Sequence, residues 1–412
     1  MTGPLEIRNV RSIDEISKED WDGLANPTNL PYDPFLSYDF FAALEHSGSV
    51  APETGWGPYH LVATEENNEL VGIMPLYLKG HSRGEYVFDH GWARGFEMAG
   101  GQYYPKLLCA VPFTPVTGRR LFALGEHALH IKSQLLRYAV KQGQLQGLSS
   151  LHINFIETEL SPVLEDQNFL IRSDTQFHWE NQDYNSFDDF LGSLQSRKRK
   201  AIKKERRQAL INDLAVEWVT GDDLKTKHWD AFYQFYVDTF DRKWGTPYLT
   251  RSFFDQIHET LSKHIVLIFA KREEDYIAAA LNFIGEDTLY GRYWGAKEHH
   301  DFLHFELCYY QAIDYALANH LNRVEAGAQG EHKLLRGYSP QKTFSAHYIL
   351  HEGLLGVFDD NTWKGSFTIS CWLKLNDGII GTSAQQIMGT DDGSGDDSRI
   401  FLSVHYTGTV RL

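Results

Sequence analysis

Acidic, basic and cationic side chains gather within a stretch that runs from Leu289 to Ile349. Near its end, Gln329, Glu331, His332 and Lys333 surround a glycine. Proton transfer needs a base, and an anionic ligand needs a cation or free backbone N–H groups. We therefore expect Glu331 and His332 to be the foremost candidate bases and Gln329 and Lys333 to bind the ligand. The alternative for Glu331 is a structural ion pair.

Two neighbouring elements add further candidates. The strand predicted before the cluster places Arg292 and Trp294 on one face, because side chains alternate along a strand. The helical spacing of residues 302–321 places His304 and Glu306 in a first turn. Arg292, Trp294 and His304 are expected to bind the ligand, and Glu306 is the next candidate base. The alternative is a helix packed on a sheet, with Glu306 in a buried ion pair and His304 as a packing residue.

Composition places the chain among soluble globular proteins. Its 412 residues suffice for two or three domains, with 42% hydrophobic and 23% charged residues. The net charge of −16 argues against non-specific DNA binding. No signal peptide or membrane-spanning run is visible and the cysteines lack CxxC spacing, so a cytoplasmic location is expected. The histidines do not cluster at ligand spacing, so no metal site is expected.

The predicted elements occur twice in the same order, which indicates an α+β fold built as a tandem repeat. Each copy has a strand, helices, a three-strand meander, another helix and closing strands. We expect the first domain at residues 1–182, with an insert at 91–124, and the second at 183–350. The predicted meander strands are 59–64, 70–79 and 85–90 in the first copy and 265–271, 276–284 and 288–296 in the second, followed by helices at 127–142 and 302–321.

A strongly basic run, residues 196–208, lies between the two copies and holds eight Lys or Arg and a single Glu. Such a run in an acidic protein predicts contact with phosphate or another anionic ligand, or else a solvated helix face that links the domains. Both interpretations stay open. Ile202, Leu210 and Ile211 predict that one face of this helix packs against the protein.

Seven motifs of the chain resemble one family. They are VFDHGWA (87–93), GGQYYPKL (100–107), VPFTPVTGRR (111–120), KWGTPYLT (243–250), GRYWGA (291–296), LHFELCYYQ (303–311) and GAQGEHKLLRGY (327–338). The family is the bacterial FemAB-like branch of the GNAT N-acyltransferases, and the resemblance covers about residues 5–350. It implies two GNAT-like domains with a substrate cleft between them. It also implies transfer of an acyl or aminoacyl group to an amine, in the better-known Fem enzymes from aminoacyl-tRNA to a peptidoglycan precursor.

Donor and acceptor follow only in part from this resemblance. The donor is acyl-CoA or an aminoacyl-tRNA, with tRNA as a partner in the second case, and the acceptor is a small-molecule or peptide amine. GNAT enzymes usually hold the coenzyme A pyrophosphate with a glycine-rich loop before a helix. Here Thr117, Gly118 and Arg119 offer one glycine and a cation before a predicted helix, so they are the candidate donor contacts. Trp244 is a further candidate contact.

A non-catalytic function competes with this interpretation. A paired GNAT scaffold can recognise cell-wall peptide or sugar without reacting with it. The candidate stacking surfaces are Trp92, Tyr103, Tyr104, Trp244 and Trp294. Packing in the core is the other interpretation for these aromatic residues.

The chain departs from the family at about residue 351. Residues 365–375 and 400–405 alternate like strands and resemble the opening strands of a laminin-G-like, concanavalin-type jelly roll. We therefore expect residues 351–412 to form an incomplete β segment. The four aspartates of the loop 391–397 predict either a calcium site or, with more weight, a solvated hairpin loop.

Overall fold

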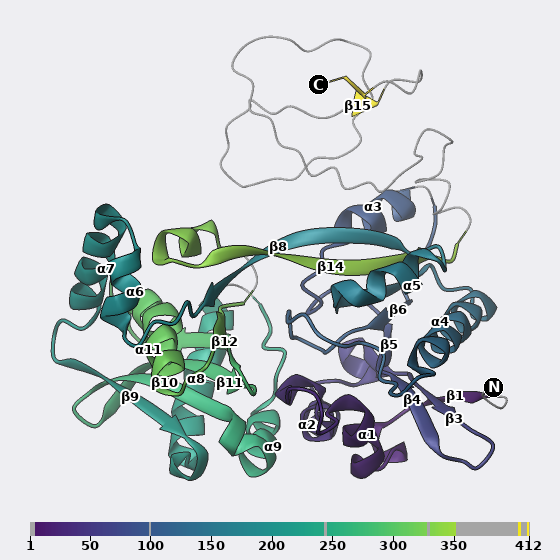
Figure 1. Cartoon of the computed structure of the whole chain (residues 1–412), viewed down its shortest axis with the longest axis horizontal. Helices are drawn as coiled ribbons and strands as arrows, with labels where there is room; N and C mark the ends of the chain where they lie inside the picture. Colours follow the sequence, from purple (N-terminus) through teal and green to yellow (C-terminus); the bar gives the residue numbers. More distant parts are fainter. Residues whose placement is uncertain are drawn as a thin grey trace.

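Two lobes lie side by side, and two long strands run across both of them (Figure 1). These strands are β8 (Leu170–Glu180) and β14 (Ser339–Ile349). The computed structural model describes residues 5–98, 100–242, 245–327 and 330–351, together with the dipeptides 403–404 and 410–411.

The first half of the chain supplies one lobe. Ser17 and Ser37 begin its first two helices, because each side-chain oxygen accepts the backbone N–H of the residue three positions later. The helices are α1 (Lys18–Ala25), α2 (Tyr38–His46), α3 (His90–Met98), α4 (Ala128–Leu145) and α5 (Ser161–Glu165). The strands before β8 are β1 (Glu6–Val10), β2 (Trp56–Pro58), β3 (His60–Thr64), β4 (Leu70–Met74), β5 (Leu76–Lys79), β6 (Lys106–Cys109) and β7 (Ser150–Ile156).

The second half supplies the other lobe. Its helices are α6 (Phe187–Ser193), α7 (Ser196–Ala209), α8 (Thr226–Arg242), α9 (Arg251–Leu261), α10 (Leu303–Phe305) and α11 (Gln311–Ala318). A π-helical turn, η7 (Glu306–Tyr310), joins α10 to α11, and a 3-10 segment, η8 (Glu331–Arg336), precedes β14. Its remaining strands are β9 (Leu214–Thr220), β10 (Ile265–Arg272), β11 (Asp275–Ile284), β12 (Thr288–Ala296) and β13 (Arg323–Glu325).

One eleven-stranded sheet joins the lobes, in the order β2-β5-β6-β7-β14-β8-β13-β12-β11-β10-β9, and β1, β3 and β4 form a separate three-stranded sheet. Each half has one parallel pair, β6 with β7 and β12 with β13, and the other pairs of the large sheet are antiparallel. In both halves the strands of the parallel pair are separated in sequence by a helix, α4 in the first and α11 in the second. The repeated order confirms an α+β fold built as a tandem repeat.

Strands from the two halves alternate at the centre of this sheet. β14, from the end of the second half, pairs with β7, whereas β8, from the end of the first half, pairs with β13. β8 and β14 also pair with each other. Since pairing crosses between the halves here, a domain boundary at 182/183 stays a prediction.

The prediction of a strand at residues 85–90 is wrong. This segment is a loop that leads into α3, and β6 takes the third strand position instead. Gly84 and Tyr86 have φ of +79° and +57°, which interrupts an extended chain. Glu85 turns inward to a buried lysine on β6. The region expected as an insert therefore includes α3 and β6.

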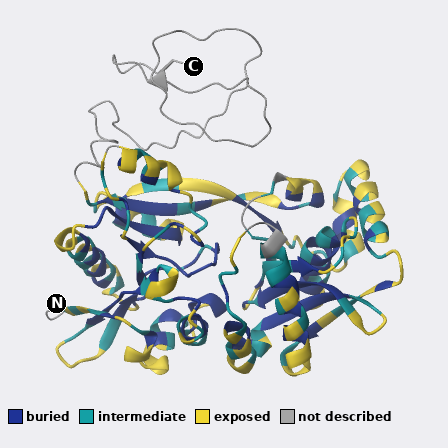
Figure 2. Ribbon diagram, turned by 180° about the vertical axis from the view of Figure 1, so that it is seen from behind, coloured by how far each residue is buried: buried dark blue, intermediate teal, exposed yellow. Residues whose placement is uncertain are grey.

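Apolar packing extends from one lobe into the other. A single core cluster contains Phe35 and Phe40 of the first half and Phe253 and Phe283 of the second. The ring centroids of Phe35 and Phe283 lie 4.9 Å apart, and those of Phe40 and Phe253 lie 5.8 Å apart. The strands are mostly buried, whereas the outer helices carry exposed faces (Figure 2). The halves are thus held together by side-chain packing as well as by strand pairing.

The predicted β segment after residue 351 falls largely outside the described residues. Within it, β15 (Ser403–Val404) and β16 (Val410–Arg411) form an antiparallel pair. The loop 391–397 and its calcium alternative lie outside the described residues. In the described part of the chain, no helix combines the length and apolar character needed to cross a bilayer.

Close packing of α8 on β12 depends on Gly295. A Cβ atom at this position would lie 2.2 Å from the carbonyl oxygen of Phe235. We expect Gly295→Ala to lower the free energy of unfolding by about 1–3 kcal/mol, the usual effect of overpacking. In α6, a Cβ atom at Gly192 would enter open space, so Gly192→Ala should raise stability by about 0.5–1 kcal/mol. Urea unfolding of both variants measures this, and equal effects would contradict the close approach.

Candidate functional site

The parallel ladder between β12 and β13 stops partway along β12. Thr288–Tyr290 pairs with Arg323–Glu325. β12 then continues to Ala296, and among the described strands none pairs with it there on the β13 side. We call the group Tyr290, Arg292, Glu325 and Gly327 the ladder end.

Glu325 places a carboxyl group at the ladder end. Its side chain is 7% exposed, and no described residue forms a hydrogen bond with Oε2. Oε1 lies 3.7 Å from His178 Nδ1 and 4.0 Å from Arg323 Nη1. Burial raises the pKa of Glu325 to about 8 and lowers the pKa of His178 to about 4. Both groups are therefore mostly uncharged at neutral pH, and the carboxyl changes its protonation close to it.

Glu325 is not among the site residues predicted from the sequence. The sequence gives little indication of a site here, because Glu325 is a single carboxylate at the end of a three-residue strand. Only the pairing of β13 with β12 and β8 shows that this carboxylate is buried.

Two glycines shape the chain after β13. Gly327 and Gly330 have φ of +75° and +111°, a region that residues with a Cβ rarely adopt. The turn brings Lys333 back to the ladder end, where Nζ donates to the carbonyl of Gly327 over 2.9 Å. Burial lowers the pKa of Lys333 to about 8. Lys333, a predicted ligand contact, therefore lies beside the ladder end and is still mostly charged at pH 7.

His332 lies on the outer side of the same turn. Its Nε2 atom is 3.0 Å from the hydroxyl of Tyr309, and its ring centroid is 5.6 Å from that of Phe305. Desolvation and the nearby cations of Arg336 and Lys333 lower the pKa of His332. A neutral imidazole at pH 7 can accept a proton, so the geometry is compatible with the predicted role.

Three predicted site residues are not placed by the structure. Gln329 and Trp244 lie outside the described residues, as does the side chain of Glu331. Their roles stay predictions.

Glu306 is fully buried and lies in a network of hydrogen bonds. Arg206 of α7 donates to both of its oxygens over 2.9–3.2 Å, and Gln311 Nε2 donates to Oε1 over 2.8 Å. Arg206 also contacts Asp314 at 2.6 Å. A carboxylate with both oxygens occupied is not available to a substrate proton, so the geometry favours the structural alternative for Glu306.

The basic helix α7 contributes to this network through one face. Ile202 is buried and Leu210 is half-buried, as predicted, whereas Ile211 is 54% exposed. The prediction that Ile211 packs is therefore wrong, because the chain has left the helix at Leu210.

Arg292, Trp294 and His304 lie at and beyond the ladder end. Arg292 Nη2 donates to the carbonyl of Phe113 over 2.5 Å, so this side chain joins the second half to the first. The rings of Trp294 and His304 are 5.3 Å apart, and His304 is 5.4 Å from Tyr309. The structure thus brings His304, Trp294 and, through Tyr309, His332 into one aromatic group.

Thr117, Gly118 and Arg119 lie in the loop after β6. Residues 120–127 separate them from the start of α4 at Ala128, so they do not form the N-terminus of that helix. Arg119 donates to the carbonyls of Leu24 and Ala25 at the end of α1. The guanidinium thus satisfies free carbonyls of a helix end, a structural task that accounts for its position.

A buried charge cluster in the first half was not recognised from the sequence. Lys106 Nζ donates to Glu85 Oε2 over 2.8 Å and contacts Asp89. The hydroxyl of Tyr103 donates to Asp89 over 2.7 Å and lies 3.2 Å from His152 Nε2. Asp89, Tyr103 and Lys106 belong to the motifs VFDHGWA and GGQYYPKL, whose aromatic residues include predicted stacking surfaces and whose charged residues carry no predicted role.

The aromatic residues of these motifs are engaged in packing or hydrogen bonds. Tyr103 is buried, the hydroxyl of Tyr104 lies 2.8 Å from Ser82 Oγ, and the ring of Trp92 lies 4.9 Å from that of His347. This arrangement favours core packing over a stacking surface for these three.

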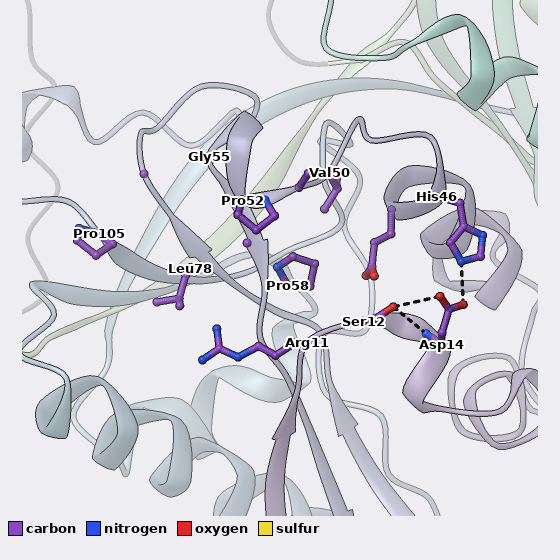
Figure 3. Close-up of a pocket in the computed structure, with 14 residues that line it drawn as sticks. Arg11, Ser12, Asp14, His46, Val50, Pro52, Gly55, Pro58, Leu78 and Pro105 are labelled. Carbon is purple, nitrogen blue, oxygen red and sulfur yellow. Dashed lines mark hydrogen bonds and ion pairs between the residues drawn. The ribbon is translucent and has the colours of Figure 1, made fainter.

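An open cavity of about 610 Å³ lies on the first lobe (Figure 3), and the ladder-end residues do not line it. Arg11 extends along one side of it, and Asp14 with His46 lies on the other, with proline rings between them. Asp14 Oδ1 is 2.7 Å from His46 Nε2, and the Arg11 guanidinium lies 4.4 Å from the centroid of Tyr59. The charges around it are mixed, so the cavity does not define a ligand class.

In the part of the chain that the structure describes, no group of three or more His, Cys, Asp or Glu is arranged to hold a metal ion.

The Arg206–Glu306 pair gives a stability test. Arg206→Met leaves Glu306 buried without its main partner, so we expect a loss of about 3–5 kcal/mol in the free energy of unfolding. Lys203→Met, on the same helix, breaks only an exposed contact with Asp188 and should cost less than about 1 kcal/mol. Chemical denaturation of the two variants measures the difference. Equal stabilities would show that Glu306 does not need this partner.

Comparisons with known proteins agree with this architecture. The crystal structure of FemX is similar over 83% of this chain and 98% of its own, with a TM-score of 0.53 and 14% identity. The C-terminal domain of a putative lysylphosphatidylglycerol synthetase from Agrobacterium fabrum is similar over 85% of this chain and 97% of its own, with a TM-score of 0.50 and 8% identity. Such low identities show a shared fold alone, and no curated protein matches the sequence. The family model of FemAB-like proteins, described as peptidoglycan biosynthesis/recognition, matches residues 12–363, and the chain therefore belongs to the FemAB-like family.

Proposed function

We propose that this protein is a cytoplasmic N-acyltransferase that transfers an acyl or aminoacyl group to an amine of a peptidoglycan-related peptide. Membership of the FemAB-like family supports a transferase related to peptidoglycan. The observation that carries the finer proposal is the ladder end. There a carboxyl whose Oε2 has no hydrogen-bond partner among the described residues lies close to a glycine turn and to a lysine with a lowered pKa.

Each of these groups has a task in acyl transfer. Backbone N–H groups in the turn at Gly327 and Gly330, together with Lys333, stabilise the oxyanion that forms when the amine attacks the donor carbonyl. His332 or Glu331 takes the proton that the nitrogen loses as the tetrahedral intermediate collapses. Arg292 and the Trp294–His304 pair bind the donor close to this point.

Acyl-CoA and aminoacyl-tRNA both remain open as donors. Thr117, Gly118 and Arg119 stay the proposed phosphate contacts in the first half, although Arg119 is partly engaged by α1. For a tRNA donor, the exposed cations Arg197, Lys200 and Lys204 of α7 are the proposed phosphate contacts.

The proposal is tested by turnover. Purified protein is incubated with radiolabelled acetyl-CoA or aminoacyl-tRNA and with a lysine-containing cell-wall stem peptide, and amide product is quantified. Binding of the peptide without product from either donor would favour the non-catalytic recognition module.

Variants of the turn separate the two proposed bases. Glu331→Gln or His332→Gln should lower kcat by about 10²–10⁴-fold if that residue takes the proton, with little change in acceptor affinity. Lys342→Gln, an exposed change on β14, serves as the control. Full activity in both turn variants would remove Glu331 and His332 from the mechanism.

A further inference from the structure

We propose that Glu325 forms the acceptor subsite, where it binds the ammonium group of a primary amine and takes its first proton. The inference rests on the proposed N-acyltransferase function and specifies its acceptor as a cationic primary amine. It adds a residue and a step to the mechanism, because acylation of an ammonium group requires two protons to leave the nitrogen.

Glu325 differs from other buried glutamates of this chain. Both oxygens of Glu306 accept hydrogen bonds. Glu85 Oε2 accepts one from Lys106 over 2.8 Å, although its Oε1 has no hydrogen-bond partner among the described residues. Glu325 Oε2 has no hydrogen-bond partner among the described residues, and Oε1 has only the longer contacts to His178 and Arg323. A buried acceptor without a donor is unfavourable, and an ammonium group would supply the missing hydrogen bonds.

The tandem repeat offers an internal comparison. His152 on β7 lies directly across from His347 on β14, and Glu325 on β13 lies directly across from His178 on β8. Every ring nitrogen of the first pair has a hydrogen-bond partner. The two Nδ1 atoms are 2.6 Å apart, and the Nε2 atoms of His152 and His347 lie within 2.9 Å of the hydroxyl oxygens of Ser150 and Ser345, respectively. At the equivalent place in the second half, one partner is a carboxyl and its Oε2 is unpaired among the described residues. The two halves thus place a polar side chain opposite a histidine at the same point of the sheet, but it is a histidine in the first half and a carboxyl in the second.

Charges of both signs surround Glu325. Asp33 and Asp287 raise the pKa of Glu325, whereas the neighbouring arginines lower it. Carboxylates as well as cations therefore lie near its carboxyl group. The pKa of Asp33 is itself raised to about 6, mainly by burial. The titratable and charged groups around Glu325 come from several elements: His178 on β8, Arg323 on its own strand, Arg292 and Tyr290 on β12, Asp287 before β12, Asp33 in the loop before Pro34 and Lys333 of η8.

The ammonium R–NH₃⁺ loses one proton to the Glu325 carboxylate and becomes the free amine R–NH₂. The nitrogen lone pair forms a bond to the carbonyl carbon of the donor R′C(O)–X, and the C–X bond breaks. The second proton passes to the leaving group, giving R′C(O)–NHR, HX and protonated Glu325, which later releases its proton to solvent.

Proton linkage gives a readout that does not require turnover. The pKa of Glu325 is raised from 4.5 to about 8, so the protein is stabilised by its neutral form below about pH 4.5, and this stability is lost as pH rises through 8. Ammonium binding favours the carboxylate and therefore expels a proton at pH 7. Affinity for the amine should accordingly rise between pH 6 and pH 8.

The experiment uses the wild-type chain, Glu325→Gln and the control Glu180→Gln. Glu180 is an exposed glutamate that, like Glu325, lies near Arg323. The binding probes are N-acetyl-L-lysine amide, which carries an ammonium group, and N-acetyl-L-norleucine amide, which does not. Calorimetry at pH 7 in phosphate and in Tris buffers measures the number of protons released on binding.

We expect wild type and Glu180→Gln to bind the lysine probe and to release close to one proton per bound probe. Neither protein should bind the norleucine probe. Glu325→Gln should lose this binding and at least 100-fold of kcat/KM, while its melting temperature should exceed that of wild type at pH 9 and approach it at pH 5. The subsite is overturned if wild type does not bind the lysine probe, binds both probes equally, or binds without releasing a proton. These outcomes are measured on wild type, so they decide the question even if Glu325→Gln does not fold.

The failure of this inference is distinguishable from failure of the proposed function. Turnover by wild type together with full activity of Glu325→Gln would reject the subsite and keep the transferase. No turnover by wild type with any donor, despite selective binding of the lysine probe, would reject the transferase and leave an amine-binding site.

Discussion

Pairing between β8 and β14 is the interaction on which the rest of the structure depends. Residues 170–178 of β8 align with residues 339–347 of β14 in one antiparallel ladder. The chain reaches β8 at the end of its first half and β14 at the end of its second, so this ladder closes two similar units into one sheet. The same two strands place His178 opposite Glu325 and His347 opposite His152. The ladder end therefore keeps its geometry only while the two halves remain paired.

Buried charge is distributed unequally over the two halves. In the first half, Lys106, Glu85 and Asp89 neutralise one another inside the protein. In the second half, Arg206 and Glu306 do the same beneath α7. Removing such charges from water is costly, and close pairing offsets much of that cost. Glu325 lacks a comparable pair among the described residues, which makes its carboxyl the place where a ligand charge has the most to contribute.

Sequence patterns predicted most of the architecture, since strands such as β10 and β11 are mostly apolar and α11 has a helical repeat of apolar residues. They failed at residues 85–90, where an alternating pattern arises from charged residues that turn inward to Lys106. Four predicted contacts lie at or near the ladder end, namely Arg292, Lys333, Trp294 and His304. Glu306 and Arg119 were proposed from their residue types, whereas their partners Arg206 and the end of α1 lie about 100 residues away in sequence. Such partners, and the burial of Glu325, are fixed by long-range pairing that a local pattern does not contain.

The central claim is that acyl transfer takes place at the ladder end. The most direct test is a crystal structure of the protein with the expected product, a stem peptide whose lysine side chain carries an Nε-acyl group. The account predicts that the amide nitrogen lies within hydrogen-bonding distance of Glu325 and that the acyl oxygen points to the turn at Gly327 and Gly330. A product bound in the cavity beside Arg11, or one whose amide lies far from Glu325, would contradict it.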